Sequence, residues 1–334
     1  MWYRKNHRDL PWRRTHDPYA VWISEVMLQQ TRVETVVPYY ERFLAAMPNV
    51  HVLAAAPLDR VLELWSGLGY YRRARLLHRG ASELAERHGG QLPRYAKALA
   101  SIAGIGRYTA GAIASIAHGL EEPIVDGNVA RVLSRLYALV DHPKRTKRKL
   151  WLHAETLVRG EDPGALNQAL MELGATVCTP KNPSCGSCPV ERQCEGRARG
   201  IEGTLPRVVR KTVPKVVKLQ AFVIETGRSI LCGKRKPDAL YGGMWEPLML
   251  GENDDPRALL GMPHASFMPK GTFVHVLTHR RLVVDVLVGR APTKRKLRSF
   301  GDYEIIEAVH KAALPNLAMS RLARRTLTAA FKQR

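Results

Sequence analysis

Along the first part of the chain the apolar residues recur about every 3.6 positions, which predicts helices. Asp17-Pro18 marks a helix start, because Asp can accept from free N–H groups and Pro suits the first turn. This helix is expected to run from Tyr19 to Thr31. The same period continues from residue 38 to residue 90 and predicts several short helices. The breaks between them are expected at Pro48, Pro57 and Gly67.

A glycine-rich turn follows, between a helix that begins at 92–93 and a helix over 109–118. Gly104 and Gly106 permit backbone angles that are closed to other residues, and N–H groups at a helix N-terminus suit a phosphate. Arg107 can add a charge-assisted contact. Taken alone, the turn is equally explained as an ordinary connection between two core helices.

Two carboxylic acids lie where their surroundings are expected to shift their pKa values in opposite directions. Glu25 shares a helix face with Trp22 and Leu28, so burial should raise its pKa, as suits a general acid. Asp126 precedes a helix that starts at Val129, so the helix N-terminus should lower its pKa. Such a pair is typical of glycosidic bond cleavage. The alternatives are a glutamate at the rim of an amphipathic helix and an aspartate that only caps one.

Aromatic and basic side chains are close together in residues 64–75, where one helix ends and another begins. The segment contains Tyr70, Tyr71 and three arginines. Rings that stack on bases and cations that bind phosphates are typical of nucleic-acid contact. Tyrosines at a helix junction are also often half-buried core residues. The basic run 144–149 is interpreted first as a solvated loop and second as a phosphate contact.

The amino-acid composition indicates that the protein binds a polyanion. The chain has 334 residues, enough for two domains, and a formal net charge of +22. Nucleic acid is the expected partner, and an anionic membrane is the rival. No apolar run is long enough to span a bilayer, and no secretory signal opens the sequence. We therefore expect an intracellular protein, in the cytoplasm or nucleoid. The first residues of the sequence resemble the middle of a helix.

Four of the five cysteines form a cluster with the spacing C-x6-C-x2-C-x5-C, made of Cys178, Cys185, Cys188 and Cys194. Four thiolates this close together indicate a metal site in a reducing compartment. Zinc and a 4Fe–4S cluster both accept four cysteines, and zinc is the commoner structural ion. The fifth, Cys232, lies in an apolar segment and is expected to be a core residue.

The pattern then changes to the alternation of apolar and polar residues that is typical of strands. Residues 198–216, rich in Gly, Pro, Arg and Lys, are predicted to be a linker. Strands are expected at 219–224, 229–232, 273–278 and 282–288, and helices at about 303–313 and 320–331. The predicted fold is therefore multidomain, an all-α region followed by an α+β domain.

The hairpin with Asp126 after it resembles the helix-hairpin-helix of base-excision DNA glycosylases. The cysteine spacing resembles the cluster loop of the endonuclease III group, which favours a 4Fe–4S cluster over zinc. Endonuclease III-like enzymes have a lysine just after the hairpin that forms a Schiff base, and Tyr108 at that position cannot. Glu25 within Ser24-Glu25-Val-Met-Leu-Gln-Gln30-Thr31, together with Tyr108, resembles the adenine DNA glycosylase (MutY) family.

The resemblance implies a monofunctional DNA glycosylase that removes adenine opposite 8-oxoguanine or G in double-stranded DNA, and that acts as a monomer. Glu25 would protonate adenine N7. Asp126 would stabilise the sugar cation, with Tyr108 and Asn128 in support. The residues implied to contact the duplex near the lesion are Gln30, Thr31 and Tyr70.

The resemblance also implies how the rest of the chain is used. Gly104, Gly106 and Arg107 would bind a phosphate, and a monovalent cation at the hairpin is part of that expectation. Domains are expected at 1–197, with the hairpin at about 92–118 and the cluster loop at 178–194, and at 217–334.

The segment Tyr241-Gly242-Gly243-Met-Trp245-Glu246 gives residues 217–334 a resemblance to Nudix-type domains. The acidic helix of active Nudix hydrolases has no equivalent in residues 251–265, so pyrophosphatase activity is not expected. In the family a Phe-Ser-His loop recognises 8-oxoguanine. Here Leu277 replaces the aromatic residue, and Thr278 and His279 supply the polar groups; a simple polar turn is the alternative.

Two alternative functions are also consistent with the sequence. One is a bifunctional, endonuclease III-like glycosylase/lyase for oxidised pyrimidines. The other is a non-catalytic DNA-binding protein stabilised by zinc.

Overall fold

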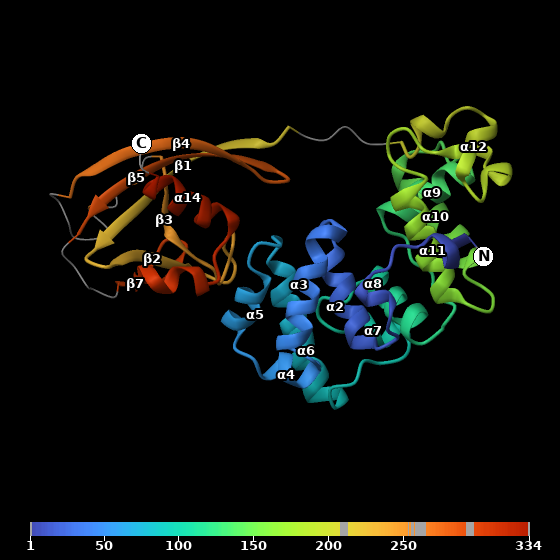
Figure 1. Ribbon diagram of the computed structural model, residues 1–334, viewed down its shortest axis with the longest axis horizontal. Coiled ribbons are helices and arrows are strands. Elements are labelled where there is room, and N and C mark those ends of the chain that lie inside the picture. The colour runs from blue at the N-terminus through green and yellow to red at the C-terminus, as the bar shows by residue number, and fades with distance from the viewer. Residues whose placement is uncertain are drawn as a thin grey trace. The chain divides into compact units, whose positions relative to one another are not determined.

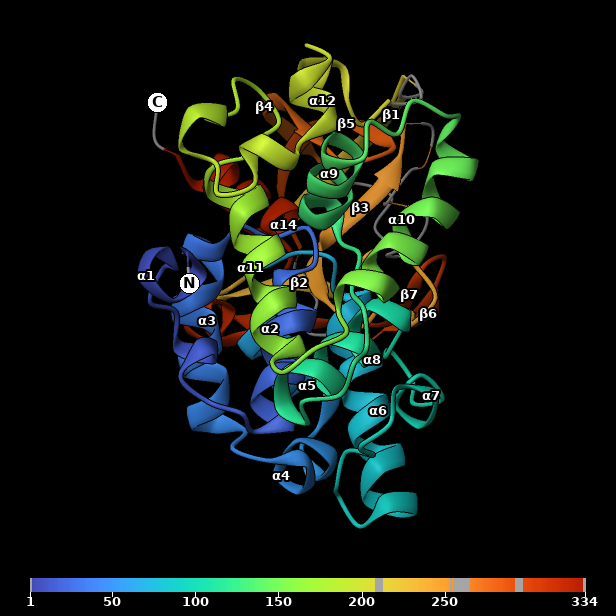
Figure 2. The ribbon, with the colours of Figure 1, turned by 90° about the vertical axis from the view of Figure 1, so that its right-hand side faces the viewer.

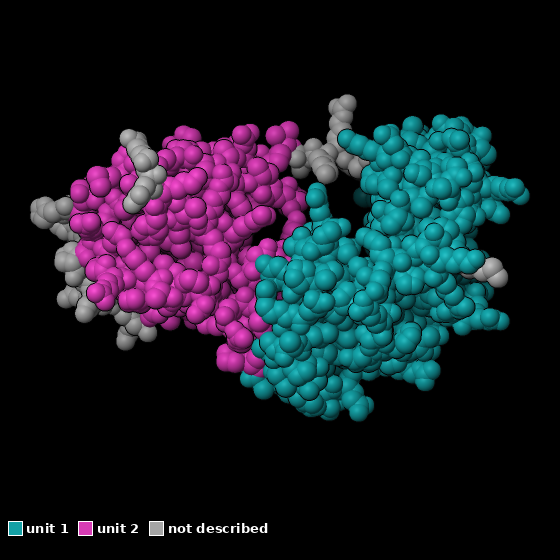
Figure 3. Space-filling view, viewed as in Figure 1, with its two compact units in different colours: residues 1–55, 76–210 teal, residues 56–75, 211–334 magenta. Residues whose placement is uncertain are grey.

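The computed structural model describes residues 2–207, 213–252, 254, 257, 265–291 and 297–332. The chain divides into two compact units (Figure 3). Unit 1 comprises Met1–Ala55 and Leu76–Arg210, and unit 2 comprises Ala56–Arg75 and Lys211–Arg334. The domain boundaries expected from the sequence stay predictions, and the structure adds that residues 56–75 pack with the C-terminal part. No helix in the described part is long and apolar enough to cross a membrane.

Helix α2 (Pro18–Leu28) is almost completely buried within unit 1. Its predicted start is confirmed, because the Asp17 carboxylate accepts from the backbone N–H groups of Tyr19 and Ala20. It packs against α3 (Val33–Ala46) and α8 (Arg107–Ala112), beside which it is drawn in Figures 1 and 2. The other early elements are α1 (Trp2–Asn6), η1 (Pro11–Arg13), α4 (Val50–Ala55) and α6 (Arg72–His88), the last of which crosses the unit boundary.

The first helix of the hairpin is shorter than expected. It is α7 (Ala96–Leu99) and does not begin at 92–93. Pro93 restricts Leu92 to extended backbone, and Leu92 has no side-chain oxygen to cap a helix. The second helix, α8, continues into a π-helical turn, η2 (Ile113–Ala117).

Helices α9 (Gly127–Leu136), α10 (Pro143–Leu157) and α11 (Pro163–Thr176) complete the helical part of unit 1 (Figure 1). The interpretation of 144–149 as a loop is wrong, because these residues lie in α10. Pro143 occupies its first turn, and the His142 ring accepts from the Lys144 N–H. Four short helices follow: η3 (Cys185–Ser187), η4 (Glu191–Gln193), α12 (Glu195–Ala198) and η5 (Glu202–Thr204).

Unit 2 contains a mixed seven-stranded sheet with the order β4-β5-β1-β3-β2-β7-β6, in which β1 and β5 are parallel and the other pairs antiparallel. The four strands expected from the alternating pattern are confirmed. Three more were not predicted. The strands are β1 (Lys215–Thr226), β2 (Ser229–Arg235), β3 (Trp245–Gly251), β4 (Phe267–Val276), β5 (Arg280–Arg290), β6 (Leu297–Phe300) and β7 (Tyr303–His310).

The helix expected at 303–313 is wrong, because Tyr303–His310 forms β7 and pairs with β2. Its buried residues, Tyr303, Ile306 and Val309, are spaced by three. A spacing of three is close to the helical period, so it led to the prediction of a helix. The segment is a strand because it pairs with β2. A short 3₁₀ segment, η6 (Lys311–Asn316), follows.

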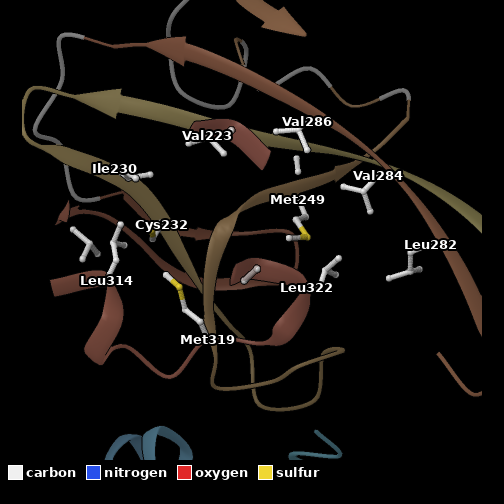
Figure 4. Packing of buried hydrophobic residues seen from close by; sticks show 14 residues of the cluster. Val223, Ile230, Cys232, Met249, Leu282, Val284, Val286, Leu314, Met319 and Leu322 are labelled. Atoms are coloured by element: carbon white, nitrogen blue, oxygen red, sulfur yellow. The ribbon is translucent and has the colours of Figure 1, made fainter. Parts of the chain in front are cut away.

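The second predicted helix is confirmed as α14 (Arg321–Phe331), which covers one face of the sheet (Figure 4). Val223, Met249 and Val284 project from three strands toward Leu322 of α14 in a continuous apolar cluster. Cys232 lies in this cluster, fully buried, as expected of a core residue.

Residues 56–75, which include α5 (Leu58–Trp65), are held in unit 2 by polar contacts with distant parts of the chain. The Ser66 hydroxyl donates to the Met319 carbonyl at 2.8 Å, and the Arg75 guanidinium donates to the Gly242 carbonyl at 2.6 Å.

Candidate active site

Glu25 is a buried carboxyl on α2, with 4% of the residue exposed. The Tyr108 hydroxyl donates to its Oε2 at 2.6 Å. The pKa of Glu25 is raised to about 7, chiefly by burial and also by the Asp126 charge, while the hydrogen bond from Tyr108 and the Arg13 cation act to lower it. Glu25 therefore holds a proton near neutrality, as its predicted position against Trp22 indicated.

Asp126 is the N-cap residue of α9. Its Oδ1 accepts from the Val129 N–H at 2.7 Å, and its Oδ2 accepts from the Asn128 side-chain amide at 3.1 Å. The predicted fall of its pKa is wrong: burial raises the pKa of Asp126 by more than these N–H groups lower it. The two carboxyls thus differ in their partners, an O–H for Glu25 and N–H groups for Asp126, and not in the direction of the pKa shift.

A chain of hydrogen bonds connects Asp126 with the start of the cysteine loop. Asn128, which donates to Asp126, accepts from Arg131 Nη2 at 2.8 Å. Arg131 Nε donates to the Cys178 carbonyl at 2.7 Å, and Arg131 Nη2 also donates to the Gly174 carbonyl. Sequence reasoning missed Arg131. The available signal was a pair of arginines four positions apart, Arg131 and Arg135, among the apolar residues Val129, Val132 and Leu133.

The four clustered cysteines are free, partly buried thiols on one loop. Burial raises the pKa of the Cys188 thiol, and the charges of the other three cysteines add to the rise, so the four lie within electrostatic reach of one another. The buried Arg135 guanidinium donates to Cys178 Sγ at 3.3 Å and to the Thr179 carbonyl at 2.8 Å. In the described part of the chain, no group of three or more His, Cys, Asp or Glu side chains could hold a metal ion as the side chains now lie.

The hairpin turn needs glycine at Gly104, where φ is +81° and a Cβ atom would lie 2.9 Å from the Leu76 Cβ. Gly106 is the N-cap residue of α8, with open space around it. The Arg107 guanidinium stacks on the Trp151 ring at 3.7 Å from its centroid and forms an ion pair with Glu155 at 2.8 Å. The Arg107 side chain remains 61% exposed in this ion pair, so a phosphate can still reach it.

Two residues expected to contact the duplex have left-handed backbone conformations. Gln30, directly after α2, has φ +57°, and Tyr70 has φ +50°. Both are exposed. Non-glycine residues in this region are strained by about 1–3 kcal/mol each and are enriched at functional sites. Thr31, next to Gln30, is partly exposed, and its hydroxyl lies 3.4 Å from the Gln29 carbonyl.

Within unit 2 the Tyr70 hydroxyl lies 3.2 Å from the Thr278 hydroxyl, so the structure brings these two expected site residues together. His279 is exposed in the turn between β4 and β5. The neighbouring Tyr71 is buried and packs edge-on against Tyr241, so of the two tyrosines only Tyr70 is free to contact a ligand.

A second group that sequence reasoning missed is Glu172 on α11, which is fully buried. Its carboxylate binds two arginines from the N-terminal segment, Arg8 and Arg13. A glutamate in the apolar run Met171-Glu172-Leu173 was the available signal, but its partners are about 160 residues away in sequence.

Residues 23–155 match the family model described as "HhH-GPD superfamily base excision DNA repair protein". The chain is 51% identical over 209 residues to an adenine DNA glycosylase of Homo sapiens, covering 59% of this chain and 38% of that protein. It is 38% identical over 353 residues to one of Arabidopsis thaliana, covering 86% and 56%. It thus spans about half the length, or less, of these curated relatives. A solved thermostable thymine-DNA glycosylase matches with a TM-score of 0.55 and 30% identity, over 59% of this chain and 92% of that one.

Proposed function

Because this chain belongs to the HhH-GPD superfamily of base excision DNA repair proteins and, within it, to the adenine DNA glycosylase (MutY) family, we propose that it is a monofunctional adenine DNA glycosylase. The proposed substrate is double-stranded DNA that carries adenine opposite 8-oxoguanine or G. The observation that carries the proposal is the buried Glu25 carboxyl, whose pKa is raised to about 7 near a second, partly buried carboxyl, Asp126.

In the proposed reaction the adenine leaves the base stack and enters the site. The protonated Glu25 carboxyl gives its proton to adenine N7, so the base departs as a neutral leaving group when the N-glycosidic bond breaks. The ionised Asp126 stabilises the sugar cation that forms; water then adds at C1′ and loses a proton, which restores the Glu25 carboxyl and leaves an abasic site. Tyr108 orients Glu25 through its hydroxyl, and Asn128 orients Asp126 through its amide.

Tyr108 also supports the monofunctional reaction, because a phenol cannot form the imine that a lyase needs. The exposed, left-handed Gln30 and Tyr70 are proposed to enter the duplex, with Thr31 near the 8-oxoguanine. Gly104, Gly106 and Arg107 are proposed to hold a DNA phosphate, together with a monovalent cation.

The donor set of the cysteine loop fits a 4Fe–4S cluster: four free thiols from Cys178, Cys185, Cys188 and Cys194, and an Arg135 N–H directed at one sulfur. We propose that these cysteines hold one such cluster. When bound, it would cross-link the loop and thereby support Arg131 and Asn128, with no part in the chemical step.

For the C-terminal sheet we propose a Nudix-like domain that recognises 8-oxoguanine through Thr278 and His279. The contact between the Tyr70 and Thr278 hydroxyls supports this proposal. Most of residues 251–265, where the acidic Nudix helix was expected to be missing, lie outside the described residues, so the absence of pyrophosphatase activity stays a prediction.

Single-turnover base release on matched duplexes with adenine opposite 8-oxoguanine, G, C and T tests the proposal. We expect release opposite 8-oxoguanine and G, and little opposite C or T. Borohydride should trap no enzyme–DNA adduct in high yield, and the purified protein should be brown with broad visible absorption. A high-yield adduct with oxidised pyrimidine substrates would favour the lyase, and a colourless protein that releases no base would favour the zinc-stabilised DNA-binding protein.

A further inference from the structure

The carboxylate of Glu172 is saturated by donors from two arginines. Its Oε1 accepts from the Arg8 backbone N–H at 3.0 Å and from Arg8 Nε at 2.9 Å. Its Oε2 accepts from Arg8 Nη2 at 2.9 Å and from Arg13 Nη2 at 2.7 Å. Although burial acts to raise it, these donors lower the pKa of Glu172 to about 2, so the residue is an anion at every pH at which the enzyme works.

Arg13 is the cation that acts on Glu25. It lies on η1, which packs against α2, and it is nearly buried, with 9% of its side chain exposed. Its charge favours the ionised form of Glu25, yet the two form no ion pair in this structure, in which both residues are described. The Arg13 guanidinium is bound instead by Glu172 and by the Arg8 carbonyl at 3.0 Å.

Among the described residues, Arg13 is the positive charge with a resolved effect on the pKa of Glu25, although α8 and α3 carry Arg107 and Arg42. Tyr108 comes from α8 and Asp126 from the start of α9; the hydrogen bond from Tyr108 lowers the pKa of Glu25, and the Asp126 charge raises it. The π-helical turn η2 packs on α2 and has no titratable side chain. Helix α3 also packs on α2, and its titratable side chains are those of Glu34, Tyr39, Tyr40, Glu41 and Arg42.

We propose that Glu172 is a positioning residue for the general acid: by binding Arg13, it offsets and restrains a cation that would otherwise pair with Glu25. The inference rests on the proposed function, in which Glu25 must be protonated to act. An anion beside Arg13 reduces the positive field at Glu25, and the bidentate grip on Arg8 fixes that anion in place. Glu172 touches no reacting atom in this account, and it acts through Arg13.

The substitution Glu172→Gln keeps the shape of the side chain and removes its charge. A Gln amide can still accept from Arg8 through its oxygen, but its NH₂ group faces the Arg13 donors and repels them. Arg13 is then released with its charge uncompensated. We expect the alkaline limb of the single-turnover pH profile, which reports Glu25, to move down by about one pH unit, so that base release at pH 8, expressed relative to each protein's plateau, is about tenfold lower than in wild type.

Two further variants test the direction in which each charge moves the alkaline limb. Arg13→Gln removes the cation and should move the alkaline limb to higher pH. The double variant Arg13→Gln/Glu172→Gln removes both charges and should return the limb close to the wild-type position. Glu161→Gln is the matched control, because it makes the same charge change at an exposed residue just before α11 and should leave the profile unchanged.

If Glu172 serves folding alone, the variants at Arg13 and Glu172 should have a lower plateau rate with the alkaline limb at the wild-type pH. That result would overturn the proposal. The pKa of Glu25 should also be measured in the free protein by carboxyl ¹³C NMR. If wild type releases no adenine, the proposed function fails, yet the NMR shift in Glu172→Gln still tests the positioning role. If wild type is active and both the limb and the NMR pKa are unmoved, only the positioning role fails.

Discussion

Two buried glutamates, one in each unit, accept a hydrogen bond from a tyrosine hydroxyl and differ in what else reaches them. Glu25 accepts from Tyr108 at 2.6 Å, and Glu246 of β3 accepts from Tyr303 at 2.9 Å. Glu246 is also bound directly by the Arg235 guanidinium at 2.6 Å, and Arg235 in turn binds Asp302. Burial raises the pKa of Glu246 as it does that of Glu25, but at Glu246 the guanidinium in direct contact opposes the rise.

If Glu25 is the general acid that we propose, this difference separates a reactive carboxyl from a structural one. Burial, a tyrosine partner and a raised pKa are common to both sites, and the position of the arginine differs between them. In unit 2 the guanidinium is in contact with the carboxylate, so the pair forms a fixed ionic part of the core. In unit 1 a second glutamate, Glu172, binds Arg13, and no ion pair between Arg13 and Glu25 is present among the described residues.

The largest expected effect is that of Glu25→Gln, which removes the transferable proton and keeps the size of the side chain. We expect base release to fall about 10³-fold, within the range of general acid catalysis. DNA binding should persist, because the proposed phosphate contacts are at the hairpin, not at Glu25. Single-turnover kinetics with a mobility-shift control would measure this, and unchanged cleavage would refute the role of Glu25.

Asp126→Asn should lower base release by about 10²- to 10³-fold, because the charge that stabilises the sugar cation is lost. Asn caps helices as well as Asp does, so α9 should remain folded. The same kinetics measure the effect, and the circular dichroism spectrum checks the fold. An Asn variant with normal turnover would assign Asp126 to capping alone.

Glu246→Gln is the matching change at the other buried glutamate. It leaves Arg235 without its buried partner, so the free energy of unfolding should fall by about 3 kcal/mol. The rate of base release per folded molecule should stay at the wild-type value. Denaturant unfolding measures the stability, and active-site titration gives the rate per folded molecule. A large loss of turnover without a loss of stability would show that the role of Glu246 is not purely structural.

The smallest effect is expected from Tyr108→Phe. Removing the hydroxyl removes a hydrogen bond that favours ionised Glu25, so the pKa of Glu25 should rise and the alkaline limb should move to higher pH. The plateau should fall only about threefold, through weaker orientation of the acid. The pH profile of the variant measures both, and a limb that moved to lower pH would contradict the assigned sign.

Sequence reasoning succeeded where the cause is local. The cap at Asp17, the burial of Glu25 on one helix face and the start of α9 all follow from neighbouring residues. It failed where distant segments decide: β7 is a strand because β2 pairs with it, and the pKa of Asp126 rises because the folded chain buries it. Glu172 and Arg131 could not be assigned roles from sequence, because their partners come from other helices and loops.

Glu25 is proposed to be protonated at neutral pH and to donate its proton during base release. The most direct test is the single-turnover rate constant of the wild-type protein on adenine opposite 8-oxoguanine, measured from pH 5 to pH 9 beside that of Glu25→Gln. The predicted result is a plateau that ends near pH 7 and then falls about tenfold per pH unit, with no such limb in the variant. A wild-type rate constant that stays level or rises from pH 6 to pH 9 would contradict the role of Glu25 as the general acid.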